Sequence, residues 1–153
     1  MTEICFFQSK NIKDYKSILV GLQPDFDQEH WSYLLTWCEV IDPDPADFGK
    51  YWKVWLVETQ GRIVGICGLY SLKHKDNSEL WLGWFGVLPQ YRSNKIGQAA
   101  IQYMEAEGRR AGAQKLMSYI SPGEQPLKFY TNNGFEDTGE VQEDFYLVIE
   151  KSL

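Results

Sequence analysis

The chain has 153 residues, of which 44% are hydrophobic, 15% aromatic and 24% charged. This composition is typical of one folded domain over residues 1–153 and excludes a disordered chain. The formal net charge of −6 argues against broad nucleic-acid binding, which needs a basic surface that displaces counterions. No apolar run is long enough to cross a bilayer, so we expect no membrane partner.

The first fifty residues predict one strand and two helices. The segment EICFFQ (residues 3–8) has the composition of a short strand. Residues 14–22 and 28–41 then show the apolar spacing of helices. Two prolines in DPDPADFG (residues 42–49) end the second helix, because a proline also restricts the residue before it.

Three β-rich runs follow. The segment YWKVWLVETQGRIVGICGLYSL (residues 51–72) holds two runs separated by Thr-Gln-Gly at residues 59–61, which predicts a hairpin. The third run is ELWLGWFGVL (residues 79–88). Its alternation is disturbed at Gly83 and Gly86, which indicates a β-bulge or a close backbone approach.

The second half of the chain alternates between helices and strands. A long helix is expected over residues 94–112, with Gly112 as its C-terminal stop. Shorter elements follow it: a strand at 115–121, a helix at 124–133, and strands at 135–141 and 144–151. The complete order is β, α, α, β, β, β, α, β, α, β, β. It predicts an α/β chain with a largely antiparallel front half and one β-α-β crossover.

The stretch VLPQYRSNKIGQ (residues 87–98) predicts a strand that turns at a proline and starts a helix. The first turn of a helix has N–H groups without intrahelical partners, and with the helix dipole they form an anion site. The stretch supplies cations, capping residues and a glycine for such a site: Arg92, Lys95, Ser93, Asn94 and Gly97. The alternative is a capped helix whose basic residues face water, and physical chemistry alone leaves both open.

Two motifs carry a resemblance to a known family. The unit V-x-P-x-Y-R-x-x-x-I-G resembles the acyl-coenzyme A loop of the GNAT N-acetyltransferase superfamily, whose pattern is Arg/Gln-x-x-Gly-x-Gly/Ala. Arg92 and Gly97 match this pattern, and Lys95 replaces the first glycine. About forty residues later, KFYTNNGF resembles the second signature, Phe-Tyr-x-x-x-Gly-Phe. The matching residues are Phe129, Tyr130, Gly134 and Phe135.

The resemblance covers nearly the whole chain and implies a fold and a co-substrate. The implied fold is the α/β GNAT acyl-CoA N-acyltransferase fold, a mixed, mostly antiparallel central sheet flanked by helices. The implied co-substrate is acetyl-CoA, whose pyrophosphate lies in the loop amides and whose pantetheine arm pairs with the preceding strand. The cofactor-binding residues implied in this way are Phe85, Gly86, Val87, Arg92, Ser93, Asn94, Lys95, Ile96, Gly97 and Gln98.

Lys95 is the main departure from the family pattern. Glycine is useful at such a position when φ must be positive or when a ligand passes close to the backbone. We expect lysine to be tolerated if it keeps helical φ/ψ and points outward, where it donates to a phosphate. Our hypothesis is that Lys95 strengthens coenzyme binding.

Acyl transfer from a thioester to an amine needs a neutral nucleophile, a polarised carbonyl and a protonated leaving sulfur. The resemblance assigns the polarisation of the carbonyl to the backbone amide of Val87 or a neighbour, which would stabilise the oxyanion that develops. It assigns the proton for the departing thiolate to Tyr130. The alternative role for Tyr130 is packing against Phe129 and Phe135.

The general base is the least defined part of the site. Some relatives carry a glutamate on the strand before the loop, and Trp81 stands at about that position here. If no bulge intervenes, the odd-numbered residues of 79–87 share one face, which makes Glu79 a candidate base. The alternatives are a solvated carboxylate at the strand end, or no base at all, with water and backbone carbonyls carrying the proton away.

The acceptor wall is expected in residues 25–47. This segment holds seven acidic residues and no lysine or arginine, together with Trp31, Tyr33 and Trp37. Such a wall attracts a cationic amine by Coulomb steering and cation–π contact. We expect direct transfer to a small-molecule amine in a ternary complex. The alternatives are protein N-terminal or lysine acetylation, a non-catalytic acyl-CoA-binding module, and a structural domain without ligand.

The remaining expectations concern metals, compartment and assembly. The isolated cysteines and histidines fit neither a disulfide framework nor a metal site: Cys5, Cys38, Cys67, His30 and His74. The start MTEICFFQSK lacks the features of a secretory signal, so we expect a reduced, cytoplasmic, metal-free protein. The late strand DFYLVIE (residues 144–150) either forms a homodimer edge or completes the sheet.

Overall fold

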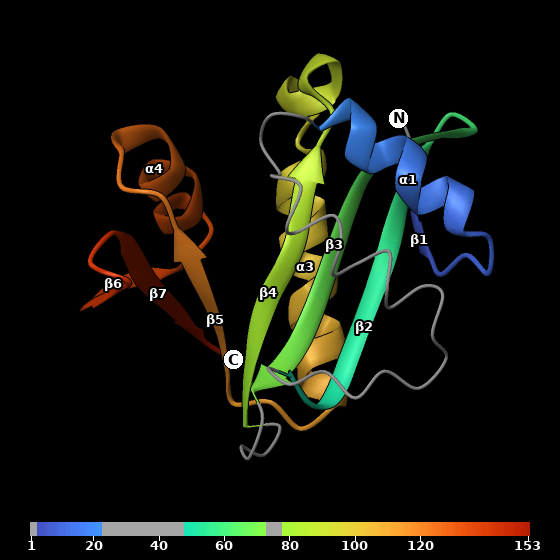
Figure 1. Ribbon diagram of the computed structural model, residues 1–153. Coiled ribbons are helices and arrows are strands. Elements are labelled where there is room, and N and C mark those ends of the chain that lie inside the picture. Colours follow the sequence, from blue (N-terminus) through green and yellow to red (C-terminus); the bar gives the residue numbers. More distant parts are fainter. Residues whose placement is uncertain (1–2, 23–47, 73–77) are drawn as a thin grey trace.

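The computed structural model describes residues 3–22, 48–72 and 78–153 and contains one seven-stranded sheet with the order β1-β2-β3-β4-β5-β7-β6 (Figure 1). The strands are β1 Ile4–Phe7, β2 Phe48–Thr59, β3 Arg62–Leu72, β4 Glu79–Val87, β5 Lys115–Ile120, β6 Glu136–Gln142 and β7 Tyr146–Ser152. The helices are α1 Ile12–Gly21, the 3₁₀ helix η1 Pro89–Asn94, α3 Ile96–Arg110 and α4 Glu124–Asn132. Only the pair β4–β5 is parallel among the paired strands of these described residues. The expected α/β class with a mixed, mostly antiparallel sheet is confirmed, while the helix predicted at residues 28–41 lies outside the described residues.

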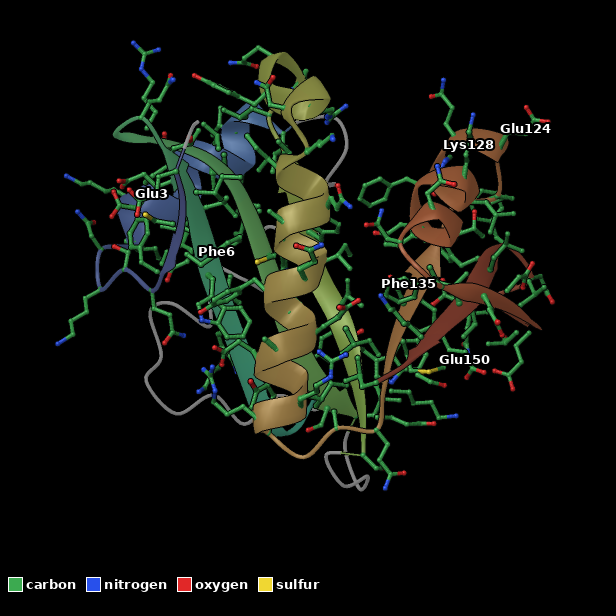
Figure 2. The ribbon with its side chains drawn as sticks, turned by 180° about the vertical axis from the view of Figure 1, so that it is seen from behind. Glu3, Phe6, Glu124, Lys128, Phe135 and Glu150 are labelled. Atoms are coloured by element: carbon green, nitrogen blue, oxygen red, sulfur yellow. The ribbon has the colours of Figure 1, made fainter. Side chains whose placement is uncertain are left out.

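The sheet separates two hydrophobic clusters. The cluster under α1 consists of Tyr15, Ile18, Leu19, Leu22, Val54, Leu56, Ile66 and Trp84. On the opposite face, α3 buries Ile96, Ala100, Ile101 and Met104 against β2, β3 and β4. Leu127, Phe129 and Tyr130 of α4 pack against this second cluster, so α4 lies on the α3 face. Figure 1 views the sheet from the α1 side and Figure 2 from the α3 side.

β4 carries a β-bulge between its two glycines, as the disturbed alternation indicated. Two residues of β4, Trp84 and Phe85, stand opposite the single residue Cys67 of β3. Trp84 has φ 53°, a left-handed conformation that costs an L-residue about 1–2 kcal/mol. Its indole is 7% exposed in the α1 cluster, so packing holds the strained residue in place.

The bulge corrects the expectation that the odd-numbered residues of 79–87 share one face. Phe85 and Val87 pack with the α3 cluster. Trp81 instead packs with Tyr70, which also contacts the α1 cluster. Because the bulge inserts one extra residue, the alternation reverses across it, and Glu79 faces away from Phe85 and Val87.

β4 and β5 pair over only three residues on each strand. Glu79, Leu80 and Trp81 pair with Lys115, Leu116 and Met117, and the two strands then diverge (Figure 1). Beyond that point β4 stays paired to β3, and β5 stays paired to β7. We call the diverging segments, residues 82–87 and 118–120, the β4–β5 opening.

The long helix α3 starts two residues later than predicted. The sequence placed its start at Asn94, but η1 occupies residues up to Asn94 and α3 begins at Ile96. Proline at the first position of η1 suits this tight turn, because its fixed φ is already helical.

The predicted stop at Gly112 is confirmed. Gly112 has φ +91°, and its N–H donates to the Arg109 carbonyl at 3.0 Å. The next N–H, of Ala113, donates to the Gly108 carbonyl at 2.8 Å, which completes a Schellman motif.

β7 lies between β5 and β6 and is paired on both sides. The late aromatic strand therefore completes the sheet, and a homodimer stays a prediction. No helix within the described ranges is long and apolar enough to span a membrane.

Replacing Gly112 by alanine should lower the free energy of unfolding by about 1 kcal/mol, because alanine resists positive φ. No atom lies within 4 Å of the added Cβ, so the backbone conformation is the whole cause. The measurement is urea unfolding. Gly112→Asn is the control, and it should lose less because asparagine tolerates the left-handed region. Equal losses in the two variants would contradict this reason.

Candidate active site

The N-terminus of α3 has no side-chain cap. Lys95 is the N-cap residue, and its side chain makes no hydrogen bond to the first turn. Ser93 and Asn94 belong to η1, so the N-cap position of α3 falls on Lys95 and on neither of them, while their contact with a phosphate stays a prediction. The N–H of Ala99 makes the first backbone bond, to the Lys95 carbonyl at 3.1 Å. The N–H groups of residues 96–98 precede that bond and point out of the helix end.

Lys95 does not keep helical dihedral angles, which corrects the condition under which lysine was expected to be tolerated. Its φ is 59° and its ψ is 20°, the left-handed region in which glycine is favoured. A glycine at this position would adopt these angles without strain. The Lys95 side chain is exposed, so the strain comes from the backbone and not from a clash.

The carbonyl and amide of Val87 face the β4–β5 opening. The N–H of Leu88 donates to the Val64 carbonyl at 2.8 Å, and Gly86 pairs with Ile66. In an antiparallel ladder alternate residues direct their N–H and C=O groups to the partner strand, so the intervening Val87 directs both groups to the other edge. A donor is thereby placed where the thioester carbonyl is expected.

Arg92 binds the end of β4. The Arg92 Nε donates to the Val87 carbonyl at 2.8 Å, and Arg92 as a whole is exposed. The guanidinium therefore ties η1 to the strand and keeps positive charge at the loop.

An aromatic cluster joins β4 to α4. The ring of Phe85 lies 6.1 Å from that of Phe129 and 6.4 Å from that of Tyr130, centroid to centroid. A Cβ on Gly97 would meet the Phe129 ring at 3.1 Å. The motif glycine is thus needed here for close packing with the second motif, which links the two motifs in space.

Tyr130 is a partly buried tyrosine at the C-terminal end of α4. Its ring makes edge contacts with Phe129 at 5.1 Å and with Phe135 at 5.5 Å. Burial raises the pKa of Tyr130 to about 12, and a side-chain hydrogen bond with Ser118 opposes part of that shift. At neutral pH the group is therefore a protonated donor.

Ser118 is a site residue that the sequence reasoning missed. It lies on β5 and is 4% exposed. Leu116 and Ile120, two residues to either side, belong to the α3 cluster, so strand alternation places Ser118 on the same face. A hydroxyl in an otherwise apolar alternation was the available signal.

Glu79 is not brought together with Tyr130. It begins β4, six residues before Phe85, which at about 3.3 Å per residue is roughly 20 Å along the strand. Its carboxylate lies 4.0 Å from Lys115 Nζ, which also contacts Glu150 at 3.3 Å. The structure thus gives Glu79 the surroundings of a partly exposed ion cluster.

Two further expectations concern the acceptor and metals. The acidic, aromatic segment 25–47 and both histidines lie outside the described residues. Within the described ranges, no group of three or more histidine, cysteine, aspartate or glutamate residues could hold a metal ion.

Comparisons with known proteins identify the family and the fold. A family model described as an acetyltransferase (GNAT) domain matches residues 50–137. Comparison with curated protein sequences gives no match. Many solved structures share the fold, and the three that follow are among them, at identities too low to show more than the fold.

The first is a GNAT-family acetyltransferase from Staphylococcus aureus Mu50, with 16% identity, TM-score 0.70, and 100% of this chain and 99% of that chain covered. The second is the ribosomal-protein-S18-alanine N-acetyltransferase from Escherichia coli, with 12% identity, TM-score 0.70 and coverage of 99% and 94%. The third is an aminoglycoside 6′-N-acetyltransferase complexed with coenzyme A, with 16% identity, TM-score 0.74 and coverage of 98% and 96%. Since the family model spans more than half of the chain, the protein belongs to the GNAT acetyltransferase family.

Proposed function

We propose that the protein is an N-acetyltransferase that moves an acetyl group from acetyl-CoA to a primary amine, directly, in a ternary complex. The observation that carries the proposal is the uncapped start of α3 beside the β4–β5 opening, with the partly buried phenol of Tyr130 on the other side of that opening. The aminoglycoside 6′-N-acetyltransferase of similar fold was solved with coenzyme A, which supports acetyl-CoA as co-substrate.

The residues of the loop fit the chemistry of a diphosphate. The N–H groups of Ile96, Gly97 and Gln98 supply donors and the positive end of the helix dipole. Lys95 and Arg92 add exposed positive charge at the same end. The open edge of β4 before Val87 gives the extended pantetheine arm a strand to lie along.

We propose the following roles for the residues near the thioester. The Val87 N–H donates to the acetyl carbonyl oxygen and stabilises the negative charge that develops there. The amine attacks the carbonyl carbon, the C–S bond breaks, and Tyr130 donates its proton to the departing thiolate. Ser118 holds the phenol oxygen in place. Glu79 as base stays a prediction of the sequence, and its distance along β4 favours proton loss through water.

For the acceptor we propose a small cationic amine, on the basis of the acidic, aromatic composition of residues 25–47. The aminoglycoside acetyltransferase supports such a substrate. The ribosomal-protein acetyltransferase supports the alternative, a protein N-terminus. Free thiols at Cys5 and Cys67 support a place in the reducing cytoplasm.

The direct test combines calorimetry with acetyl-CoA and a thiol-release assay over polyamines, aminoglycosides and peptides with free N-termini. We expect coenzyme binding and turnover with a polycationic small amine. Binding without turnover of any amine would indicate an acyl-CoA-binding module. Absence of binding would overturn the proposed function.

Removing the hydroxyl in Tyr130→Phe should lower kcat by about 10²-fold, the usual contribution of general acid catalysis. The Kd for acetyl-CoA should stay within about twofold, because the ring still packs with its neighbours. Tyr146→Phe is the matched control, since Tyr146 lies on β7 against Phe145. An unchanged kcat in Tyr130→Phe would remove Tyr130 from the chemistry.

The raised pKa of Tyr130 predicts the alkaline side of the pH profile. With its pKa at about 12, the phenol stays protonated at pH values where a free tyrosine, with pKa near ~10, has lost half its protons. We therefore expect kcat, at saturating amine and coenzyme, to show no fall from this group up to about pH 10. A falling limb with a midpoint below about pH 10 that disappears in Tyr130→Phe would contradict this environment.

Lys95 variants separate charge from backbone strain. Lys95→Asn tolerates the left-handed conformation but removes the charge, and should weaken acetyl-CoA binding about two- to fivefold, as expected for one exposed ionic contact. Lys95→Gly should weaken binding equally while keeping or raising the free energy of unfolding. Titration calorimetry and urea unfolding measure the two quantities. Unchanged or tighter binding in both variants would remove the role of Lys95.

A further inference from the structure

Lys151 of β7 reaches the C-terminal end of α4. Its Nζ donates to the Asn133 carbonyl at 2.8 Å and forms an ion pair with Glu105 of α3. The Lys151 side chain is 24% exposed and the Glu105 side chain 10% exposed. One ammonium group thus joins three elements that are far apart in the sequence.

The chemistry of both partners fits this arrangement. A carboxylate as buried as that of Glu105 needs a cation and hydrogen-bond donors nearby. The last carbonyls of α4 have no intrahelical partner, and a cation is favoured there by the helix dipole. Lys151 satisfies both requirements with a single side chain.

Gly134 makes room for the lysine. Its φ is +90°, and a Cβ at this position would lie 2.9 Å from Lys151 Cε and 3.0 Å from Lys151 Nζ. The glycine of the second motif is therefore favoured by its positive φ, and its missing Cβ leaves space for the Lys151 side chain.

The turn bound by Lys151 also holds the backbone of Tyr130. The Tyr130 carbonyl accepts the N–H groups of Asn133 and Phe135, both at 3.0 Å. Asn133 Nδ2 donates to the Phe129 carbonyl at 2.8 Å. These hydrogen bonds join Asn133 to Phe129 and Tyr130, so a shift of the Asn133 carbonyl would also move the backbone of Tyr130.

α3 and α4 lie on opposite sides of the β4–β5 opening, with Phe135 near the C-terminal end of α4 (Figure 2). The Val87 amide and the start of α3 lie on one side of this opening, and Tyr130 lies on the other. Lys151 connects the two sides, because its Nζ contacts Glu105 of α3 and the Asn133 carbonyl at the C-terminal end of α4.

We propose that Lys151 and Glu105 are positioning residues, whose ion pair ties the last turn of α4 to α3 and so fixes Tyr130 relative to the thioester site. The proposal rests on the proposed function, because the property that it explains is the rate of acetyl transfer. Neither residue touches the reacting atoms; both act through the Asn133 turn.

The main test is the double variant Glu105→Met/Lys151→Met. Replacing both members of a buried ion pair by apolar residues of similar size is often neutral or stabilising, so this variant should fold. Its link to the Asn133 carbonyl is lost. We expect kcat to fall about tenfold or more, because small misplacement of a reacting group has large effects on rate. The Kd for acetyl-CoA should stay within about twofold, because the loop amides are unchanged.

A readout without turnover accompanies the kinetics. Hydrogen exchange at the amides of residues 133–135 should be at least about tenfold faster in the double variant, as expected for a locally loosened turn. The matched control is Glu107→Met/Arg110→Met, which removes a 2.6 Å ion pair within α3 that does not reach α4. This control should keep both kcat and the exchange of residues 133–135.

The outcomes distinguish the two proposals. Turnover by the wild-type protein with unchanged kcat in the double variant would overturn the positioning role alone. Absence of turnover in the wild type with every amine would overturn the proposed function and this inference with it. If the double variant does not fold, Glu105→Gln replaces it, because glutamine keeps the shape and an acceptor but not the charge. That variant should lose about threefold or more in kcat, and an unchanged value would again overturn the proposal.

Discussion

The pairing of β4 with β5 stops after three residues on each strand, and the geometry of the site follows from that interruption. A continued ladder would use the N–H of Val87 for strand pairing. The bulge at Trp84 and Phe85 turns the last residues of β4, so that Phe85 faces α4 and the Val87 amide stays at the open edge. Packing of Trp84 in the α1 cluster stabilises this strained bulge from the other face of the sheet.

A second strained residue marks the next step along the chain. Lys95 adopts left-handed angles between η1 and α3, so the chain changes direction and the first amides of α3 remain uncapped. Two non-glycine residues with positive φ therefore flank the same loop. Such strain persists when the surrounding structure determines it, and it is common at ligand sites. Uncapped amides and an open strand edge lie at this loop, and the partly buried phenol of Tyr130 lies across the β4–β5 opening from them.

The sequence predicted most of the architecture because its elements have local causes. Gly83 and Gly86 located the bulge, Gly112 ended the helix, and the two motifs identified the family. The shared face expected for residues 79–87 depended on an unbroken strand, and the one residue inserted at the bulge reverses the alternation of side chains. Positive φ at Lys95 had no local signal once the usual glycine was absent. The Glu105–Lys151 pair joins residues 46 apart, and only the folded chain brings them together.

The most direct measurement is a crystal structure with coenzyme A. The account predicts that the diphosphate lies within hydrogen-bond distance of the backbone amides of residues 96–98, with the pantetheine arm along β4 at Val87. Its sulfur should then lie near the Tyr130 hydroxyl. Coenzyme bound elsewhere, or a loop closed by the Lys95 side chain with the Val87 amide facing β3, would contradict the account.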